Sequence, residues 1–230
     1  MITKDKILKI IIMAVAILLA LMLYGTEYSI SNNVTAIEEG ISEFIEYDVE
    51  IIRMEKVDNT IFVYFADQSK NNIGYTVLYK GLNFRYQIRK ANYGSRDRVI
   101  YIREFKTYRN KYWAVYGTNF DEKIDKIVFD DEYSTIELND LGNMSEILSI
   151  VESKNEFSGA SVIFEYRLID IGGNDITKDM RSYISDSGIN GFGRGKAELF
   201  LLNVFCIVII LIGYWIARLV GRKVSVDSFT

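Results

Sequence analysis

Residues 85–111 carry the most pronounced charge pattern of the sequence. By our count this segment holds nine lysines and arginines against two acidic residues, with tyrosine, phenylalanine and tryptophan interleaved among them. A surface of this kind suits an anionic envelope polymer such as teichoic acid, or lipid headgroups. The candidate binding residues are Arg96, Arg98, Tyr101, Arg103, Lys106 and Tyr108.

The same segment also fits ordinary β-structure without any ligand. In that interpretation alternate aromatic side chains point inward, basic side chains point outward, and acidic strands pair beside them. Residues 121–140 supply the acidic counterpart, with eight acidic residues against two lysines by our count. This interpretation is the simpler one, because cross-strand charge pairing needs no bound polymer.

A second candidate chemistry is calcium binding by the acidic residues of that counterpart. Carboxylate oxygens are the ligands that Ca²⁺ prefers, but no glycine stands where the tight turn of a calcium loop requires one. We therefore expect a solvated acidic face and no metal site. The residues concerned are Asp121, Glu122, Asp125, Asp130, Asp131 and Glu132.

The composition contains few of the residue types on which enzymatic catalysis commonly depends. The chain has no histidine and a single cysteine, Cys206, which excludes nucleophile–histidine triads, Cys–His zinc sites and an intramolecular disulfide. A serine–lysine dyad would be one way to catalyse without histidine. Residues 69–70 and 153–154 are each a serine followed by a lysine, but neighbours on a strand point to opposite faces. We expect no enzyme and no cofactor; an envelope hydrolase is the alternative, resting only on abundant carboxylates.

Two long apolar runs indicate the structural elements between which the candidate residues lie. Residues 10–24 contain no charged side chain, and residues 198–217 contain one, Glu198. With Ile7 and Leu8 included, and Lys9 able to reach toward the headgroups, the first run is about 18 residues long. Each run is thus compatible with one crossing of a bilayer, for which about 20 residues are needed. A cleaved signal peptide is the alternative for the first run, but no convincing cleavage site of the A-x-A type follows it. The sequence thus predicts two transmembrane helices.

The flanks of the two runs predict the orientation. Residues 1–9 contain Lys4, Lys6 and Lys9, and residues 218–230 contain Arg218, Arg222 and Lys223. Short basic flanks remain in the cytoplasm, so both tails are expected there and the segment between the helices outside it. The complete absence of proline beside abundant Ile, Lys and Asn indicates AT-rich coding and hence a bacterial plasma membrane.

The segment between the runs is predicted to be a β-rich extracytoplasmic domain, residues 25–184. A helix is expected over residues 35–44, and further short helices over 145–152 and 175–184. Nothing suggests alternation of strands and helices, so we expect a mainly antiparallel fold, either β-sandwich-like or α+β with one N-terminal helix. A flexible glycine-rich tether is expected over residues 185–197. Strands are predicted over residues 49–57, 60–66, 75–79, 84–89, 99–105, 112–116, 124–129, 133–138 and 161–169.

Small residues inside the apolar runs predict close helix packing. Ala16 and Ala20 are four residues apart, as are Gly213 and Ala217, and such spacing lets two helices approach closely. Asn203 is a polar side chain that would seek a partner in the membrane, unless it faces the headgroups. The helices are expected to pack on each other or on another membrane subunit.

These features together predict a non-enzymatic interaction protein. The expected partners are the lipid bilayer and another membrane protein or a second copy of this chain; nucleic acid is not expected, because the compartment disfavours it. The tails are too short for catalytic or DNA-binding domains, so inward signalling would require a partner. We therefore expect an accessory or regulatory subunit of a bacterial membrane complex. The alternative is a sensor or binder of anionic envelope polymers.

Overall fold

A computed structural model describes most of the chain and divides it into two compact units. We call Met1–Ser29, Gly81–Gln87 and Arg194–Thr230 the helix unit, and Ile30–Lys80 and Ile88–Gly193 the β domain. The residues described are 4–68, 71–95, 98–131, 134–153, 165–180, 189–193 and 196–226.

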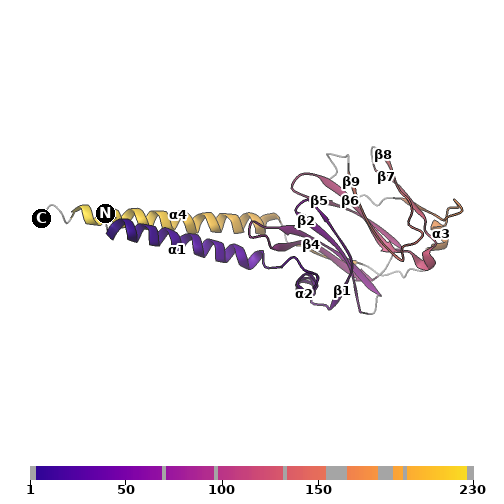
Figure 1. The fold of residues 1–230 in the computed structure, drawn as a ribbon, viewed down its shortest axis with the longest axis horizontal. Helices are drawn as coiled ribbons and strands as arrows, with labels where there is room; N and C mark the ends of the chain where they lie inside the picture. Colours follow the sequence, from indigo (N-terminus) through magenta and orange to yellow (C-terminus); the bar gives the residue numbers. More distant parts are fainter. Residues whose placement is uncertain are drawn as a thin grey trace. The chain divides into compact units, whose positions relative to one another are not determined.

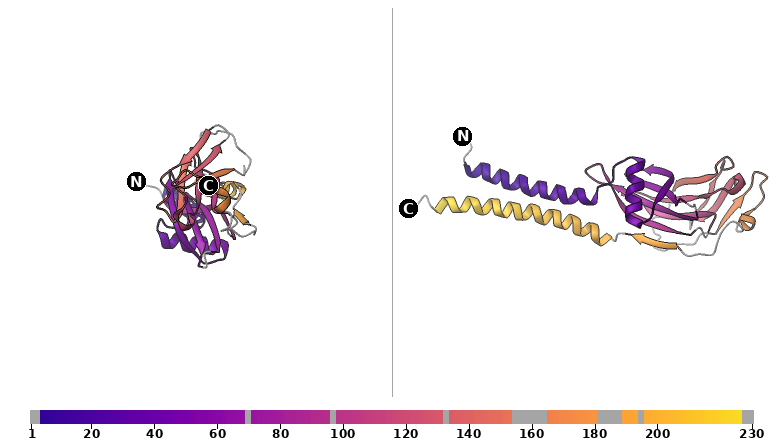
Figure 2. Two further views of the ribbon diagram at one scale, coloured as in Figure 1. Left: turned by 90° about the vertical axis from the view of Figure 1, so that its right-hand side faces the viewer. Right: turned by 90° about the horizontal axis from the view of Figure 1, so that it is seen from below.

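The helix unit is built on two long helices, α1 (Lys4–Glu27) and α4 (Lys196–Val226). They lie side by side and antiparallel, so that the start of α1 and the end of α4 share one end of the pair (Figure 1, Figure 2). Both are long and apolar enough to cross a bilayer. The unit also contains the segment Gly81–Gln87, in which residues 81–85 join two strands of the β domain and the last two residues begin the second of these strands. We call the whole segment the loop Gly81–Gln87.

The β domain has one helix of ordinary length followed by antiparallel strands. Helix α2 (Val34–Ile45) confirms the helix predicted after the first apolar run. All described strand pairs are antiparallel, which confirms the mainly antiparallel fold predicted for this segment. The strands are β1 (Val49–Val57), β2 (Thr60–Asp67), β3 (Asn72–Lys80), β4 (Tyr86–Ser95), β5 (Ile100–Lys106), β6 (Lys111–Thr118), β7 (Lys126–Asp131), β8 (Ser134–Leu138), β9 (Glu146–Glu152), β10 (Tyr166–Ile169) and β11 (Ile189–Gly193), with a short 3₁₀ turn at Phe120–Glu122 and a short helix α3 at Thr177–Met180.

The strands form three sheets, with orders β1-β2-β3-β4-β11, β5-β6-β9 and β10-β7-β8. The sheet β5-β6-β9 lies between the other two. On β6, Tyr112, Ala114 and Tyr116 join an aromatic core with residues of β2 and β3, whereas Trp113 and Val115 join a second core with β7 and β10. Because successive side chains of a strand point to opposite faces, this middle sheet is buried on both sides.

Helix α2 is capped and also covers the exposed edge of β1. The Asn33 side chain accepts a hydrogen bond from the Ala36 amide at 2.8 Å, which caps the helix start. The backbone amides of Val49 and Ile51 donate to the Ser42 hydroxyl and the Glu38 carboxylate at 3.2 and 2.9 Å. Side chains of the helix thus satisfy strand amides that would otherwise be open to another chain.

Two glycines of the β domain are required by close neighbours. Gly40 lies inside α2, and a Cβ there would come within 2.8 Å of the Ile30 side chain. Gly74 pairs with Phe65 across β2 and β3, and a Cβ there would overlap the Phe65 ring. Gly40 thus lets the Ile30 side chain pack closely against the helix, and Gly74 leaves room for the Phe65 ring.

The structure corrects several predicted elements. Glu146–Glu152 forms strand β9, so the helix predicted over residues 145–152 is wrong. Within the predicted flexible tether, Ile189–Gly193 pairs with β4 as strand β11. The predicted strand over residues 84–89 begins at Tyr86, because Phe84 adopts a left-handed turn conformation with φ 63°.

Two predicted elements extend past the described residues. The helix expected over residues 175–184 is present as Thr177–Met180, and residues 181–184 lie outside the described part of the chain. The strand expected over residues 161–169 is present as Tyr166–Ile169, and residues 161–164 likewise lie outside it.

Candidate functional site

The six predicted binding residues are distributed over different environments. Tyr101 and Arg103 lie on the same face of β5, toward the aromatic core, and Tyr101 is buried. Arg98 precedes the strand, and its amide donates to the Tyr101 hydroxyl at 3.0 Å. Arg96 lies outside the described residues.

Lys106 ends β5, and Tyr108 lies in the turn between β5 and β6. The Lys106 ammonium lies 3.9 Å from the Glu104 carboxylate, and the Tyr108 ring contacts the Tyr79 ring at 5.4 Å. Both side chains are exposed, as is that of Arg109. This hairpin tip is thus a separate group from Tyr101 and Arg103, so the predicted residues that the structure describes fall into more than one group.

Several cations of the basic segment lie over tyrosine rings. The Arg89 guanidinium is 5.1 Å from the centre of the Tyr79 ring, and the Lys90 ammonium is 5.5 Å from that of Tyr75. Such contacts stabilise a cation without an anionic partner. The acidic strand β7 pairs with β8 and β10, so the expected pairing of acidic strands beside the basic ones is not found among the described strands.

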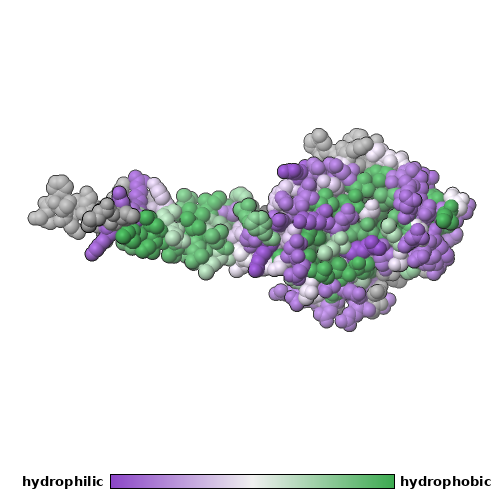
Figure 3. Space-filling model, in the orientation of Figure 1, coloured by the Kyte–Doolittle hydropathy of each residue, from purple (hydrophilic) through white to green (hydrophobic). Residues whose placement is uncertain are grey.

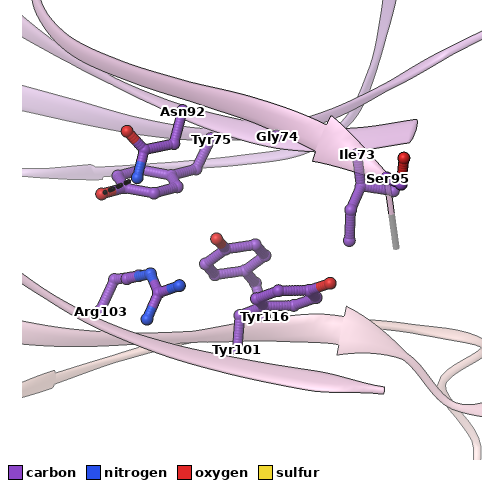
Figure 4. A pocket seen from close by; sticks show the side chains of 8 residues that line it. All are labelled: Ile73, Gly74, Tyr75, Asn92, Ser95, Tyr101, Arg103 and Tyr116. Carbon is purple, nitrogen blue, oxygen red and sulfur yellow. Dashed lines mark hydrogen bonds between the residues drawn. The ribbon is translucent and has the colours of Figure 1, made fainter. Parts of the chain in front are cut away.

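A small cavity lies beside Arg103, between the sheet that contains β3 and β4 and the sheet that contains β5 and β6. Figure 4 shows Tyr75 and Asn92 on one side and Tyr101, Arg103 and Tyr116 on the other. The Asn92 amide donates to the Tyr75 hydroxyl at 3.2 Å. The cavity volume of about 10 Å³ accommodates one water molecule at most, so the cavity as it stands excludes any larger ligand.

The electrostatics of the cavity are set by burial. Burial raises the pKa of Tyr116 well above its usual value of 10.0, and the nearby positive charge of Arg103 opposes part of the shift. The Arg103 guanidinium itself lies 5.9 Å from the centre of the Tyr101 ring. Arg103 and Tyr116 therefore supply one cation and one neutral hydroxyl inside the aromatic core.

The acidic residues considered for calcium are held individually rather than as a cluster. No group of three or more potential metal ligands comes together within the part of the chain that the structure describes. Asp121 forms an ion pair with Lys123 at 2.9 Å, and the hydroxyl of Thr135 donates to Asp130 at 2.6 Å. Glu132 lies outside the described residues.

In the turn after β10, the carboxylates accept hydrogen bonds from the backbone and side chains of the turn itself. The Asn174 side-chain amide donates to Asp170, which lowers the pKa of that carboxyl; the Asn174 backbone amide also donates to it. The Thr177 hydroxyl likewise lowers the pKa of Asp175. Gly173 supplies the positive φ of 83° that this turn requires. The arrangement is that of a self-satisfied turn.

The small residues of the apolar runs meet in the helix unit. Ala16 and Ala20 of α1 are buried, as is Ala217 of α4, and a Cβ at Gly213 would overlap the Ala16 side chain. Gly213 therefore lets the two helices approach closely, and we call the contact line formed by Ala16, Ala20, Gly213 and Ala217 the seam. Asn203 lies on the exposed face of α4, away from this seam.

Around the seam the surface of the helix pair is aliphatic and aromatic. Figure 3 shows apolar residues along the visible face of the pair. Large exposed apolar side chains of α1 and α4 include Ile10, Ile11, Leu18, Leu21, Met22, Phe205, Ile207, Leu211, Ile212, Trp215 and Leu219.

The sequence analysis missed the loop Gly81–Gln87. It presents Leu82 and Phe84, whose side chains are 88% and 74% exposed. Hydrogen bonds join the loop to the end of α1, including one from the Leu82 amide to the Tyr24 hydroxyl at 3.0 Å. The signal was present in the sequence, because two large apolar residues alternate with glycine, asparagine and arginine where a turn was due.

The chain was also compared with known proteins. No protein-family model, no curated protein and no solved structure matches it.

Proposed function

We propose that this chain is a non-enzymatic two-pass protein of a bacterial plasma membrane and serves as an accessory or regulatory subunit of a membrane complex. The observation that carries the proposal is the helix unit, which buries small residues in its seam and turns large apolar side chains outward. An exposed Leu or Ile forgoes roughly 1.5–3 kcal/mol relative to burial, so a surface with this many of them requires an apolar surrounding.

The dimensions of the helices agree with a bilayer crossing. Helix α1 has 24 residues, which at about 1.5 Å per residue gives about 36 Å. The hydrocarbon core of a bilayer is about 30 Å thick. Tyr24, near one end of the pair, lies where an aromatic belt is expected.

The charges favour one orientation. Lys4, Lys6 and Lys9 begin α1, and Arg218 lies near the end of α4, so these cations share one end of the antiparallel pair. Basic flanks favour the cytoplasm, and the β domain then lies outside it.

The orientation is tested by thiol labelling of intact cells. Cys206→Ser provides a background, into which Lys4→Cys or Ile171→Cys is introduced. We expect a membrane-impermeant maleimide to label position 171 in intact cells and position 4 only after lysis. Labelling of position 4 in intact cells would contradict the orientation.

Asn203 supports a partner in the membrane. Its amide lies on the exposed face of an otherwise apolar stretch of α4. An amide in this position is stabilised by a hydrogen bond to a neighbouring helix or to headgroups. A helix of another subunit, or of a second copy, would supply that hydrogen bond.

The partner is tested by purifying the tagged full-length protein from native membranes in mild detergent and identifying what accompanies it by mass spectrometry. We expect a stoichiometric membrane protein, whose recovery falls with Asn203→Leu. The matched control is Phe205→Leu, two residues away on the exposed surface. A protein recovered alone would overturn the accessory-subunit proposal.

The tip of the β5–β6 hairpin favours a second candidate, the binding of anionic envelope polymers. Lys106, Arg109 and Lys111 lie within six residues of one another, around the exposed ring of Tyr108. Retention on purified teichoic acid should fall with Lys106→Gln plus Arg109→Gln and with added salt. Unchanged retention in this double variant would rule out the hairpin tip as the binding surface.

A further inference from the structure

The loop Gly81–Gln87 and the end of α1 form a joint apolar surface that calls for an occupant. We propose that this loop inserts Leu82 and Phe84 into the outer interface of the lipid bilayer, as a third membrane contact beside the two helices. The inference rests on the proposed membrane crossing of α1 and α4 and adds a surface that the helices alone do not provide.

The loop is held against the end of α1 by hydrogen bonds from three of its residues. The Leu82 amide donates to the Tyr24 hydroxyl at 3.0 Å, and the Asn83 side chain donates to the Tyr28 carbonyl at 2.8 Å. The Arg85 guanidinium donates to the Ser29 carbonyl at 3.2 Å. The loop therefore has a fixed place beside the helix.

The backbone of the loop turns its apolar side chains outward. Phe84 has φ 63°, a left-handed conformation that is unfavourable for a bulky residue. The turn is closed by the Gly81 amide donating to the Arg85 carbonyl at 2.7 Å and the Phe84 amide donating to the Gly81 carbonyl at 3.2 Å. Unfavourable backbone geometry that exposes an aromatic ring is typical of a functional contact rather than of a plain turn.

The position along α1 identifies the occupant. Tyr24 lies three residues before Glu27, the first charged residue of α1 after Lys9, and stacks on Tyr28 with ring centres 4.6 Å apart. This is the depth where an aromatic belt is expected to meet the headgroups. The Leu82 backbone is bonded to that same Tyr24 hydroxyl, and Leu21 and Met22 are exposed on the helix just before it. The apolar surface of α1 therefore continues into the loop at the level of the bilayer interface.

The charge of the loop suits the same occupant. Arg85 follows the two apolar residues, and an arginine beside exposed apolar side chains can reach anionic headgroups while its neighbours contact the acyl boundary. A lipid surface thus satisfies both parts of the loop, the apolar tip and the adjacent cation.

The test places an environment-sensitive fluorophore at single cysteines of the full-length protein in lipid nanodiscs. The background is Cys206→Ser, in which the serine hydroxyl can keep the hydrogen bond of Cys206 to the Ala20 carbonyl. The three sites are Leu82→Cys in the loop, Leu18→Cys on the exposed surface of α1, and Ile171→Cys in the β domain. Ile171 is the matched control, because its side chain is 88% exposed, the same fraction as that of Leu82.

We expect the fluorophore at position 82 to emit at shorter wavelength than at position 171, to be quenched by lipids carrying a quencher, and to be severalfold less sensitive to aqueous iodide. Iodide quenching at position 82 equal to that at position 171 would overturn the inference. If position 82 is exposed to iodide while position 18 is quenched by lipid, the loop proposal fails and the membrane crossing stands. If position 18 is also exposed to iodide, the membrane crossing itself fails.

Discussion

The helix unit and the β domain place large and small side chains in opposite ways. Between α1 and α4 the buried positions include Ala16, Ala20 and Ala217, with Gly213 in close contact with Ala16, and most of the large aliphatic residues face outward, Leu202 being an exception. In the β domain the largest fully buried side chains are aromatic, and they include Phe62, Tyr64, Tyr75 and Tyr101.

The proposed membrane crossing of α1 and α4 accounts for this difference. A water-soluble domain gains stability by removing large apolar surfaces from water, so it places aromatic rings inside. Helices in lipid gain nothing from hiding a leucine from another apolar medium, so their contact depends on close approach of backbones. The two units therefore follow two packing rules, and that of the helix unit is the one expected of the proposed membrane helices.

The largest expected effect comes from removing one aromatic ring from each unit, which compares the two packing rules directly. Phe62→Ala should destabilise the β domain by about 3–5 kcal/mol, because the ring is fully buried against Tyr75, Phe105 and Tyr116. The control Phe205→Ala removes an exposed ring of α4 and should change stability little. Urea unfolding of the full chain in detergent, followed by near-UV circular dichroism, measures both. Equal losses would break the comparison.

A smaller effect is expected at the seam of the helix unit. Gly213→Ala adds a methyl group that overlaps Ala16, and overpacking of this kind costs about 1–3 kcal/mol. The distance between spin labels on α1 and α4, together with resistance to dodecyl sulfate, reports the change.

The matched substitution is Gly25→Ala in α1, where a Cβ would meet nothing within 4 Å. Alanine in a helix is favoured over glycine by up to about 1 kcal/mol, so this variant should be neutral or slightly stabilising. Similar losses in the two variants would show that close approach does not explain the first.

The sequence predicted most strands because their side chains alternate, and it failed where alternation is absent. Strand β9 reads Glu-Ile-Leu-Ser-Ile-Val-Glu, and its apolar residues also fit a helical spacing. In the structure it belongs to the middle sheet, with Ile147 in one core and Leu148 and Ile150 packed on the other. A strand buried on both faces loses the period of two by which strands are detected.

The candidate site was less accessible to sequence reasoning than the fold. Arg103 and Tyr101 are two residues apart and share a face, so period two could have placed them together. Nothing local revealed that this face meets β2 and β3, because that contact joins residues far apart in the chain. The loop Gly81–Gln87 was missed for a related reason: Phe84 extended an alternating pattern that in fact begins at Tyr86.

The next effect tests the aromatic core through pH. Burial raises the pKa of Tyr116 in the folded protein well above the usual 10.0, so on raising the pH the unfolded chain loses this proton first. The contribution to stability is thus complete below pH 10.0 and is lost above it, by about 1.4 kcal/mol per pH unit for one such group.

Tyr116→Phe should flatten this alkaline decline, since the ring contacts remain and no hydroxyl is left to ionise. Tyr108→Phe removes a hydroxyl from an exposed ring and should leave the decline in place. Urea midpoints measured from neutral pH to above the usual tyrosine pKa of 10.0 compare the two variants. An unchanged slope in Tyr116→Phe would mean that other groups govern the alkaline limit.

The smallest expected effect asks whether the two units unfold separately. Asn33→Ala removes the side chain that caps α2 and should cost the β domain about 1 kcal/mol. Asn33→Asp keeps an oxygen that can accept from the Ala36 amide and should retain most of that stability. Because α2 also covers the edge of β1 through Ser42 and Glu38, fraying its first turn should speed hydrogen exchange at Val49 and Ile51, with exchange in α1 unchanged. Equal acceleration in α1 would show that the units unfold together, and the contrast in packing would then describe one cooperative structure.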